Sequence, residues 1–480
     1  MNKKPKLLVC IVAGAAALST AVAAGEKEDA LIEKVLAAYG GDALTGMKSI
    51  AIDETYKNAF PGQGYTPVHV EFTELKQEHR LDPANQRASV ESWSANWGFV
   101  NHTRQLTAGD DIVTINYRTG DYQTASAPDY YTAFGPVIRT SDTLLAFELA
   151  RQAETANFEG ERNFLGTPHQ LISFEIPNSP RLTLYVENES GLISKMVRDT
   201  GLGPLTYQFR NHLKAKGVAY ASDFEFFINN NVNLLTVCRD VAINTVRGAA
   251  FRIDRGITEE PARIDTSEMS VDALGDGVHL VGTGFTFTAF IDAGDHVIAV
   301  GGSAGLQERV EAYREATGVD KPLRYQIATH HHTDHLDSMP AAFELGANFI
   351  APAAAVENLK AVVGDALSDE RITVLDKKLT LGPVDIHEIT TSHAQSYALV
   401  YVPAIKTVFQ ADHYNGVYQD AVSPANVGSV SLKDAVDALG LDVAIVLSAH
   451  GREATPWADF VEAVEAFDPQ PCIRQRAICG

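Results

Sequence analysis

Apolar and polar residues alternate with a period of two over much of the first half of the chain. Residues 182–186 alternate in this way, and the turn-forming residues 188–191 lead into a second run at 192–197. Residues 68–72 repeat the alternation. Alternation of this kind predicts half-buried β-strands, and a turn between two such runs predicts a hairpin. Further strands are expected at 111–117, 169–176, 205–210 and 223–228.

Helical spacing interrupts this strand-rich region twice. Residues 30–39 have apolar positions at helical intervals and end at Gly40-Gly41, and residues 142–153 have the same periodicity. Many antiparallel strands with a few helices predict a curved sheet that packs helices against one face. We expect this mainly antiparallel β domain to span residues 25–262.

The pattern changes after a charged stretch at 252–268, which contains Pro261 and has no periodicity. Beyond it, short apolar runs alternate with helical stretches, which is typical of an α/β domain. We therefore expect a second, α/β domain at 263–480. The runs are 278–281, 296–300 and 324–327, and the helical stretches are 305–316 and 354–363.

A dense group of metal-binding side chains follows one of these strands. Residues 329–335 read Thr-His-His-His-Thr-Asp-His, so that His330, His332, Asp334 and His335 form the pattern His-x-His-x-Asp-His. Imidazole and carboxylate ligands suit zinc, iron or manganese. The segment lies between an expected strand and an expected helix start, on a loop where ligand atoms can converge.

Three later residues extend this candidate site. His393, Asp412 and His450 each follow a predicted strand, at the edge where α/β proteins build their sites. Each residue taken alone is more often structural. Their order after the first group makes a shared metal site the stronger interpretation.

With these residues, the region from about 268 to 470 resembles the metallo-β-lactamase superfamily. The resemblance implies an αββα sandwich with a dinuclear centre, usually of zinc. One metal would have the ligands His330, His332 and His393. The second would have the ligands Asp334, His335 and His450, with Asp412 bridging the two metals.

The sequence departs from the family pattern in two places. Leu336-Asp337-Ser338 stands where glycines usually follow the first motif, and Val300-Gly301-Gly302-Ser303 stands where many members have an Asp-Gly turn. We expect the first departure to change only the entry into the next helix. A secreted subgroup of the family also lacks the turn.

The resemblance implies a hydrolase that uses two Zn²⁺ per chain, although Fe or Mn would also fit the ligands. Two metals lower the pKa of a shared water, and Asp334 would be the catalytic residue that orients it and shuttles its proton. The bond cleaved would be of ester type: a thioester, lactone, phosphoester or sulfate ester. Metallo-β-lactamases proper generally lack the bridging carboxylate, so the presence of Asp412 ranks β-lactam hydrolysis lower.

Side chains near the expected ligands are candidates for contact with a small-molecule, apolar substrate. Each of them, taken singly, is more often a packing or surface residue. They are Phe285, Phe287, Gln395, Tyr397, His413 and Tyr414.

Two other functions remain open at this point. The leader, first helix and long antiparallel sheet weakly resemble periplasmic lipoprotein carriers, so the protein could bind a lipid or apolar ligand and carry an accessory metal module. The same ligands also occur in mononuclear-iron persulfide dioxygenases, which are oxidoreductases.

The composition and the N-terminal sequence limit the partners and the cellular location of the protein. The 480 residues have a formal net charge of −22, which disfavours nucleic acid as a partner. Residues 1–24 have the pattern of a signal peptide, predicting a periplasmic or secreted protein. No later run is apolar enough to span a membrane, and a homo-oligomer is compatible with the sequence. An oxidising compartment would permit a Cys472–Cys479 disulfide, which the sequence leaves open, with Cys238 then left as a buried thiol.

Overall fold

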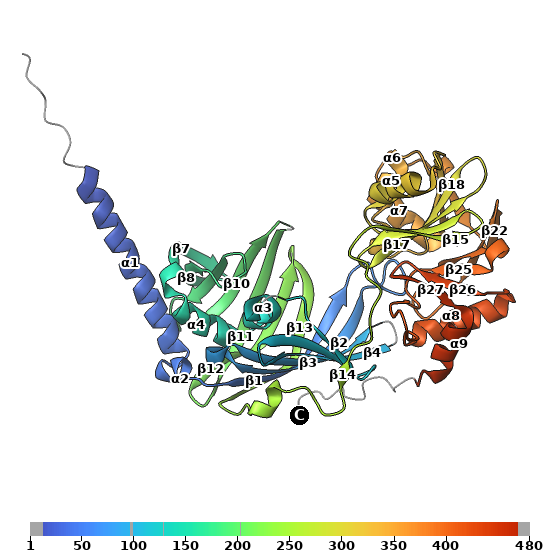
Figure 1. Ribbon diagram of the computed structural model, residues 1–480. Coiled ribbons are helices and arrows are strands. Elements are labelled where there is room, and N and C mark those ends of the chain that lie inside the picture. The colour runs from blue at the N-terminus through green and yellow to red at the C-terminus, as the bar shows by residue number, and fades with distance from the viewer. Residues whose placement is uncertain (1–12, 97–98, 128, 202, 469–480) are drawn as a thin grey trace, which may run out of the picture.

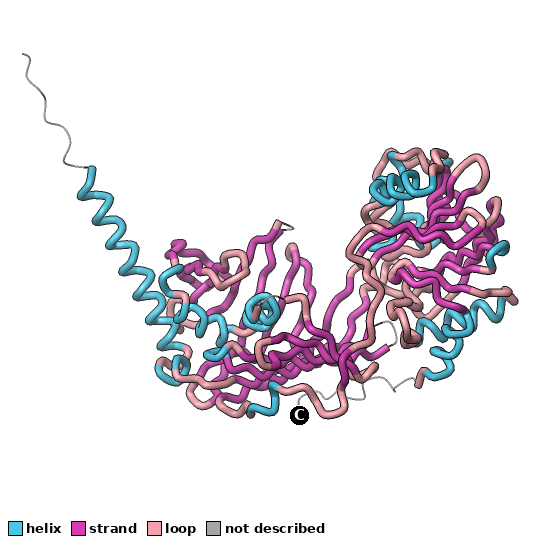
Figure 2. Tube along the Cα trace, in the orientation of Figure 1, coloured by secondary structure: helices cyan, strands magenta, loops and turns pink. Residues whose placement is uncertain are grey.

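The computed structural model describes residues 13–96, 99–127, 129–201 and 203–468. Within these ranges the chain forms two parts, a long curved sheet with helices and a two-sheet sandwich (Figure 1). Strands dominate the first part, whereas helices and strands are mixed in the second (Figure 2).

The first part is built on one sheet with the strand order β14-β6-β5-β4-β3-β2-β1-β13-β12-β11-β10-β9-β8-β7. Neighbouring strands are antiparallel wherever their register is given, except for the short parallel pair β14–β6. The strands are β1 (Ile50–Phe60), β2 (Glu71–Asp82), β3 (Arg87–Asn96), β4 (Phe99–Ala108), β5 (Asp111–Asn116), β6 (Asp121–Thr124), β7 (Asn157–Phe164), β8 (Thr167–Phe174), β9 (Leu182–Glu187), β10 (Ile193–Thr200), β11 (Gly203–Ala215), β12 (Val218–Ile228), β13 (Asn231–Ile243) and β14 (Thr258–Glu259).

Four helices belong to this part, and their apolar residues share one core with the sheet. The predicted helix at 142–153 is α4, which begins where the Ser141 side chain accepts a hydrogen bond from the Leu144 amide. Its buried face includes Leu145 and Leu149. The helices are α1 (Ala13–Ala38), α2 (Asp42–Thr45), α3 (Tyr130–Thr140) and α4 (Asp142–Arg151).

The alternation at 68–72 has a different outcome from the one predicted. Strand β2 begins only at Glu71, and the side chains of Val68, Val70 and Phe72 are 92%, 45% and 51% exposed. Residues 61–70 form the connection between β1 and β2. Period-two alternation indicates an extended chain with two faces, but it does not show that either face meets a core.

A buried ion cluster joins three neighbouring strands of the large sheet. The Glu54 carboxylate on β1 lies 2.6 Å from Nε of Arg239 on β13 and 2.6 Å from Nε2 of His79 on β2. Burial opposes ionisation of Glu54, but Arg239 and His79 outweigh it and lower the pKa of Glu54 to about 2.

The second part contains two sheets. The seven-stranded sheet has the order β15-β16-β17-β18-β19-β20-β21, and the six-stranded sheet has the order β22-β23-β24-β25-β26-β27. The strands are β15 (Ser270–Gly275), β16 (Val278–Thr283), β17 (Thr286–Asp292), β18 (Val297–Val300), β19 (Leu323–Ile327), β20 (Asn348–Pro352), β21 (Ile372–Leu375), β22 (Lys378–Leu381), β23 (Val384–Ile389), β24 (Tyr397–Val402), β25 (Thr407–Gln410), β26 (Ile445–Ser448) and β27 (Gly451–Pro456).

Helices cover the outer faces of both sheets (Figure 1). Helices α5 (Leu306–Thr317), α6 (Met339–Glu344) and α7 (Val356–Val363) share a core with the seven-stranded sheet. Helices α8 (Val427–Leu439) and α9 (Trp457–Ala466) lie by the six-stranded sheet. Apolar residues of both sheets meet in one core between them. This layering confirms the predicted αββα fold.

The two parts touch at several places. The Arg118 guanidinium on the first part donates to the carbonyl oxygen of Ala425 over 3.3 Å. The Tyr418 hydroxyl donates to Glu260 over 3.2 Å, and Arg263 forms a β-bridge with Tyr418. The β1–β2 connection makes a further contact, described below.

Two expectations about the whole chain can be compared with the structure. Among the described residues, no helix is both long and apolar enough to cross a bilayer. Cys238 is disulfide-bonded and only partly buried, so the expectation of a free, buried thiol is wrong. Cys472 and Cys479 lie outside the described residues.

Candidate metal centre

Strand ends bring the candidate ligands to one place. Strand β19 ends at Ile327 and leads into the loop that carries the first four of them. His393, Asp412 and His450 follow strands β23, β25 and β26 of the other sheet. The site therefore lies where edges of the two sheets meet, with each sheet contributing ligands.

The seven residues form two groups that share one member. Within each group the ligand atoms lie within 4.8 Å of one another. The first group is His330, His332, His393 and Asp412. The second group is Asp334, His335, His450 and Asp412.

The two carboxylate oxygens of Asp412 point into different groups. Its Oδ2 lies 3.2 Å from Nε2 of His330 and 3.1 Å from Nε2 of His393. Its Oδ1 lies 2.9 Å from Nε2 of His335 and 3.0 Å from Nε2 of His450. Burial raises the pKa of Asp412, but His335 and His393 outweigh it and hold that pKa well below its ordinary value. The carboxylate is therefore ionised and able to bridge two cations.

The spacing of the imidazoles fits a divalent metal. Nε2 of His393 lies 3.1 Å from Nε2 of His330, and Nε2 of His450 lies 3.2 Å from Nε2 of His335. A tetrahedral zinc with Zn–N bonds of about 2.0–2.1 Å separates its ligand atoms by roughly 3.4 Å. Burial, with His332 and His335 nearby, keeps the pKa of His330 well below its ordinary value. His330 therefore presents the neutral imidazole that metals bind.

Contacts on the far side of the rings fix their orientation. Nδ1 of His330 lies 3.1 Å from the Thr329 hydroxyl, and Nδ1 of His450 lies 3.1 Å from the carbonyl oxygen of Phe285. Outer contacts of this kind set the tautomer and the aim of a metal-binding histidine. His332 has its contact from the first part of the chain, because its Nε2 lies 3.0 Å from the carbonyl oxygen of Gly64.

Gly302 supports the loop from behind, and sequence reasoning gave it no role. A Cβ at Gly302 would overlap the carbonyl group of His335, and the Ser338 amide donates to the Gly302 carbonyl oxygen over 2.7 Å. The glycine pair at 301–302, noted only as a departure from the family pattern, is the signal that could have identified this close approach.

Asp334 is the most exposed of the seven, with 46% of its side chain exposed. Its Oδ2 lies 3.5 Å from Nε2 of His335 and 3.8 Å from Nε2 of His450. Its Oδ1 accepts a hydrogen bond of 2.7 Å from Nε2 of Gln63, a residue that the sequence did not single out.

Four of the six candidate substrate contacts are buried. Tyr397 stacks behind His330, with ring centroids 5.0 Å apart, and its hydroxyl accepts from the Ala411 amide. The Tyr414 hydroxyl donates to the carbonyl oxygen of Ser423 over 2.9 Å. These contacts support the ligands from within the core, so the expectation of substrate contact is corrected for these four side chains. The buried four are Phe287, Tyr397, His413 and Tyr414.

The other two candidates are at the surface. Phe285 is 59% exposed, and its ring stacks on His450 with centroids 4.8 Å apart. Gln395 is exposed, and its backbone N–H donates to the carbonyl oxygen of Tyr65 over 3.0 Å. Phe285 therefore offers apolar surface beside a ligand, whereas Gln395 joins the site to the first part of the chain.

His331 lies inside the motif but belongs to neither ligand group. Its Nε2 lies 2.8 Å from the Gly64 carbonyl oxygen, and its own carbonyl accepts from Asn358 over 3.0 Å. The ring thus contacts the β1–β2 connection.

No family model matches the sequence, and no curated protein matches it. Solved structures do match. A metallo-β-lactamase from Hirschia baltica is 20% identical with a TM-score of 0.32, covering 41% of this chain and 96% of its own. One from Pontibacter korlensis is 13% identical with a TM-score of 0.32, covering 42% and 100%. The flavodiiron protein from Giardia intestinalis is 16% identical with a TM-score of 0.32, covering 43% and 60%.

The fold assignment rests on the architecture and the ligands themselves. Two sheets face each other between helices, and the His-x-His-x-Asp-His loop and three later residues meet at their shared edge. The stretch from β15 to α9, residues 270–466, therefore has the metallo-β-lactamase fold, and its histidine and aspartate side chains form two groups suited to divalent metals.

Proposed function

We propose that the protein is a hydrolase with a dinuclear metal centre that cleaves an ester-type bond in a small, apolar molecule. The division of Asp412 between two complete ligand groups carries the proposal, because one carboxylate oxygen faces each group. Imidazole and carboxylate ligands, with no thiolate among them, favour zinc and also accept iron or manganese.

When bound, two divalent ions supply a water of lowered pKa and polarise the scissile oxygen. The chain's own contribution starts with Asp334, whose half-exposed carboxylate can accept a hydrogen bond from the attacking water and take its proton. The buried histidines keep the site rigid and exclude bulk water from its rear. No seryl or cysteinyl nucleophile is required.

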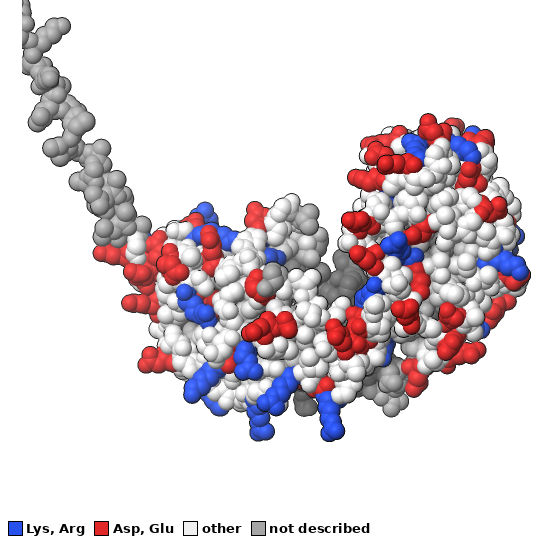
Figure 3. Space-filling view, viewed as in Figure 1, with Lys and Arg blue, Asp and Glu red and all other residues white. Residues whose placement is uncertain are grey.

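The surroundings favour an uncharged or apolar substrate. The exposed ring of Phe285 stands beside His450, where an acyl or aryl group would gain from contact with it. Acidic side chains are spread over the visible face of the second part (Figure 3). A net charge of −22 repels polyanions, so nucleic acids are poor substrates.

Metal analysis and a substrate panel test the proposal together. The purified protein should hold two zinc ions per chain and hydrolyse at least one of a thioester, lactone, phosphodiester or sulfate ester, and hydrolyse it faster than a cephalosporin. The substitution Asp334→Ala should abolish this activity. One iron per chain with no hydrolysis would instead favour the mononuclear-iron oxidoreductase alternative.

We also propose export from the cytoplasm. The support is the basic, then apolar, then small-residue order of residues 1–24. Amino-terminal sequencing of the protein from a periplasmic fraction should begin after Ala24, whereas an intact Met1 in the cytoplasmic fraction would contradict this.

A further inference from the structure

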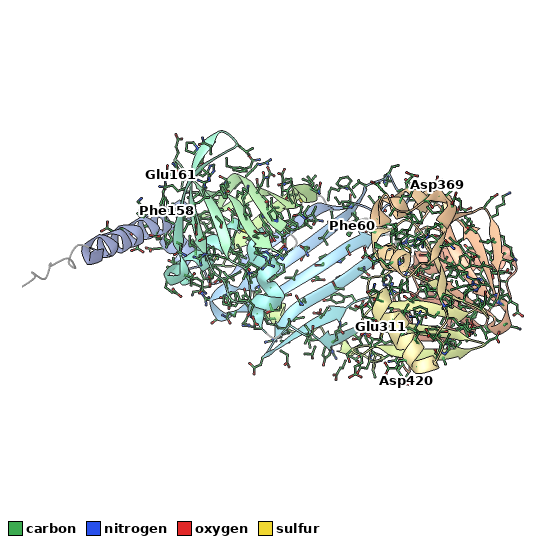
Figure 4. The ribbon with its side chains drawn as sticks, turned by 90° about the horizontal axis from the view of Figure 1, so that it is seen from above. Phe60, Phe158, Glu161, Glu311, Asp369 and Asp420 are labelled. Carbon is green, nitrogen blue, oxygen red and sulfur yellow. The ribbon has the colours of Figure 1, made fainter. Side chains whose placement is uncertain are left out.

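The connection between β1 and β2 reaches from the first part of the chain to the metal site. Figure 4 shows Phe60, the last residue of β1, at the border between the large sheet and the second part. The next four residues are Pro61, Gly62, Gln63 and Gly64. They lie more than 260 positions away in sequence from the loop that carries the first ligands, yet Gln63 and Gly64 contact it.

Three successive residues of this connection, 63–65, form hydrogen bonds with metal-binding residues or with residues close to them in sequence. Nε2 of Gln63 donates to Oδ1 of Asp334 over 2.7 Å and to the Thr333 hydroxyl over 3.4 Å. The Gly64 carbonyl oxygen faces Nε2 of His332 at 3.0 Å. The Tyr65 carbonyl oxygen accepts a hydrogen bond of 3.0 Å from the backbone N–H of Gln395. Gln395 is two residues after the ligand His393.

Two glycines let the chain approach so closely. Gly62 has a φ of +76°, and a Cβ there would lie 2.8 Å from Cγ2 of Thr333. A Cβ at Gly64 would overlap the backbone carbonyl of His69. A larger residue at position 62 would press against Thr333 of the ligand loop, and one at position 64 would distort the connection itself, with Gln63 between them.

The contact to Asp334 has a specific consequence for its carboxylate. Oδ2 faces His335 and His450, while Oδ1 is held by the Gln63 amide. A side chain that is 46% exposed can otherwise rotate about its terminal bond, because little packing restrains it. A donor on Oδ1 selects the rotamer that keeps Oδ2 among the ligands of the second group.

We propose that Gln63 is a positioning residue for Asp334, so that the first part of the chain completes the metal centre. The inference rests on the proposed function. It gives the large β-sheet part a direct role in positioning Asp334, one of the second group of metal-binding residues. This role is separate from any small molecule that the sheet binds.

Gln63→Met tests the proposal, because methionine keeps the length of the side chain and removes the donor. We expect kcat to fall by about 10- to 100-fold while KM changes by less than about threefold. A second readout does not depend on turnover: loss of the more labile of the two metals to a chelator should be about 10- to 100-fold faster in Gln63→Met.

Gln77→Met is the matched control. Gln77 lies on β2 of the same sheet and donates to Ser92 over 3.0 Å, away from the metal site, so its loss should leave kcat and metal release unchanged. If the Gln63 and Gln77 variants both hold two metals and have the same kcat and rate of metal release, the role of Gln63 is refuted while the proposed function stands. A wild-type protein that binds no metal would refute the proposed function and this inference together.

Discussion

The backbone of Gly302 lies so close to His335 that any side chain at position 302 would overlap the His335 carbonyl group. The turn after β18 and the ligand loop are therefore in direct backbone contact, and the hydrogen bond from the Ser338 amide to the Gly302 carbonyl, 2.7 Å long, joins them again. His335 is fully buried, and this contact holds the backbone from which its ring extends.

Gly302→Ala should therefore displace the ligand loop. The loop has to move because the clash is with backbone and not with the end of a flexible side chain. We expect loss of at least one metal per chain and a decrease of about 1–3 kcal/mol in the free energy of unfolding. Metal analysis and denaturant unfolding measure the two effects.

Gly248→Ala provides the control, because a Cβ at Gly248 would have nothing within 4 Å. It should retain both metals and wild-type stability. Full metal content in Gly302→Ala would show that the close approach does not position His335.

Phe285→Ala removes the exposed ring beside His450 and leaves the backbone carbonyl that His450 contacts. If an apolar substrate covers this ring, the lost contact is worth about 1.5 kcal/mol, which corresponds to roughly a tenfold increase in KM. Steady-state kinetics with short-chain and long-chain esters would measure it.

The increase should be larger for the long-chain ester and absent for the shortest one. Leu165→Ala removes another exposed apolar side chain, on the β7–β8 turn, and should not affect KM. Identical KM values for Phe285→Ala and wild type with every substrate would exclude Phe285 from the binding surface.

Glu54 makes the stability of the large sheet dependent on pH. Its pKa is lowered in the folded protein from 4.5 to about 2, so folding favours the ionised form. Its contribution is fully present above about pH 5 and is lost as the pH falls toward 2. Glu54→Gln should destabilise the protein by about 3 kcal/mol at pH 7, because Arg239 then stays buried with its charge unpaired.

The free energy of unfolding should also depend less on pH in Glu54→Gln than in wild type between pH 5 and 2. Glu74→Gln breaks a partly exposed pair with Lys57 on the same sheet and should cost less than about 1 kcal/mol. Parallel pH profiles for wild type and Glu54→Gln would contradict the role assigned to the buried cluster.

The αββα layering and the division into two metal groups came from the resemblance to the metallo-β-lactamase superfamily. From the residues alone, the sequence predicted the α/β character of the second part and the positions of the ligands, for a physical reason. Four ligands lie within six residues, and the other three follow apolar strands whose ends share one edge of a sheet. Such features are local or periodic, so they can be recognised without knowledge of tertiary contacts.

Contacts between distant segments could not be predicted in this way. Gln63 and Asp334 are 271 positions apart, and a Gly-Gln-Gly segment between two strands has the composition of an ordinary turn. His413 and Tyr414 follow a strand just as ligands do, yet both are buried behind the site. Position at a strand end does not determine whether a side chain faces the mouth or the core.

The metal content of wild type and Asp412→Asn tests the central claim most directly. The amide keeps the shape of Asp412 but removes the charge that both groups share, so we predict two divalent ions per chain in wild type and at most one in Asp412→Asn. Two ions in both proteins, or a single ion in wild type, would contradict a dinuclear centre bridged by Asp412.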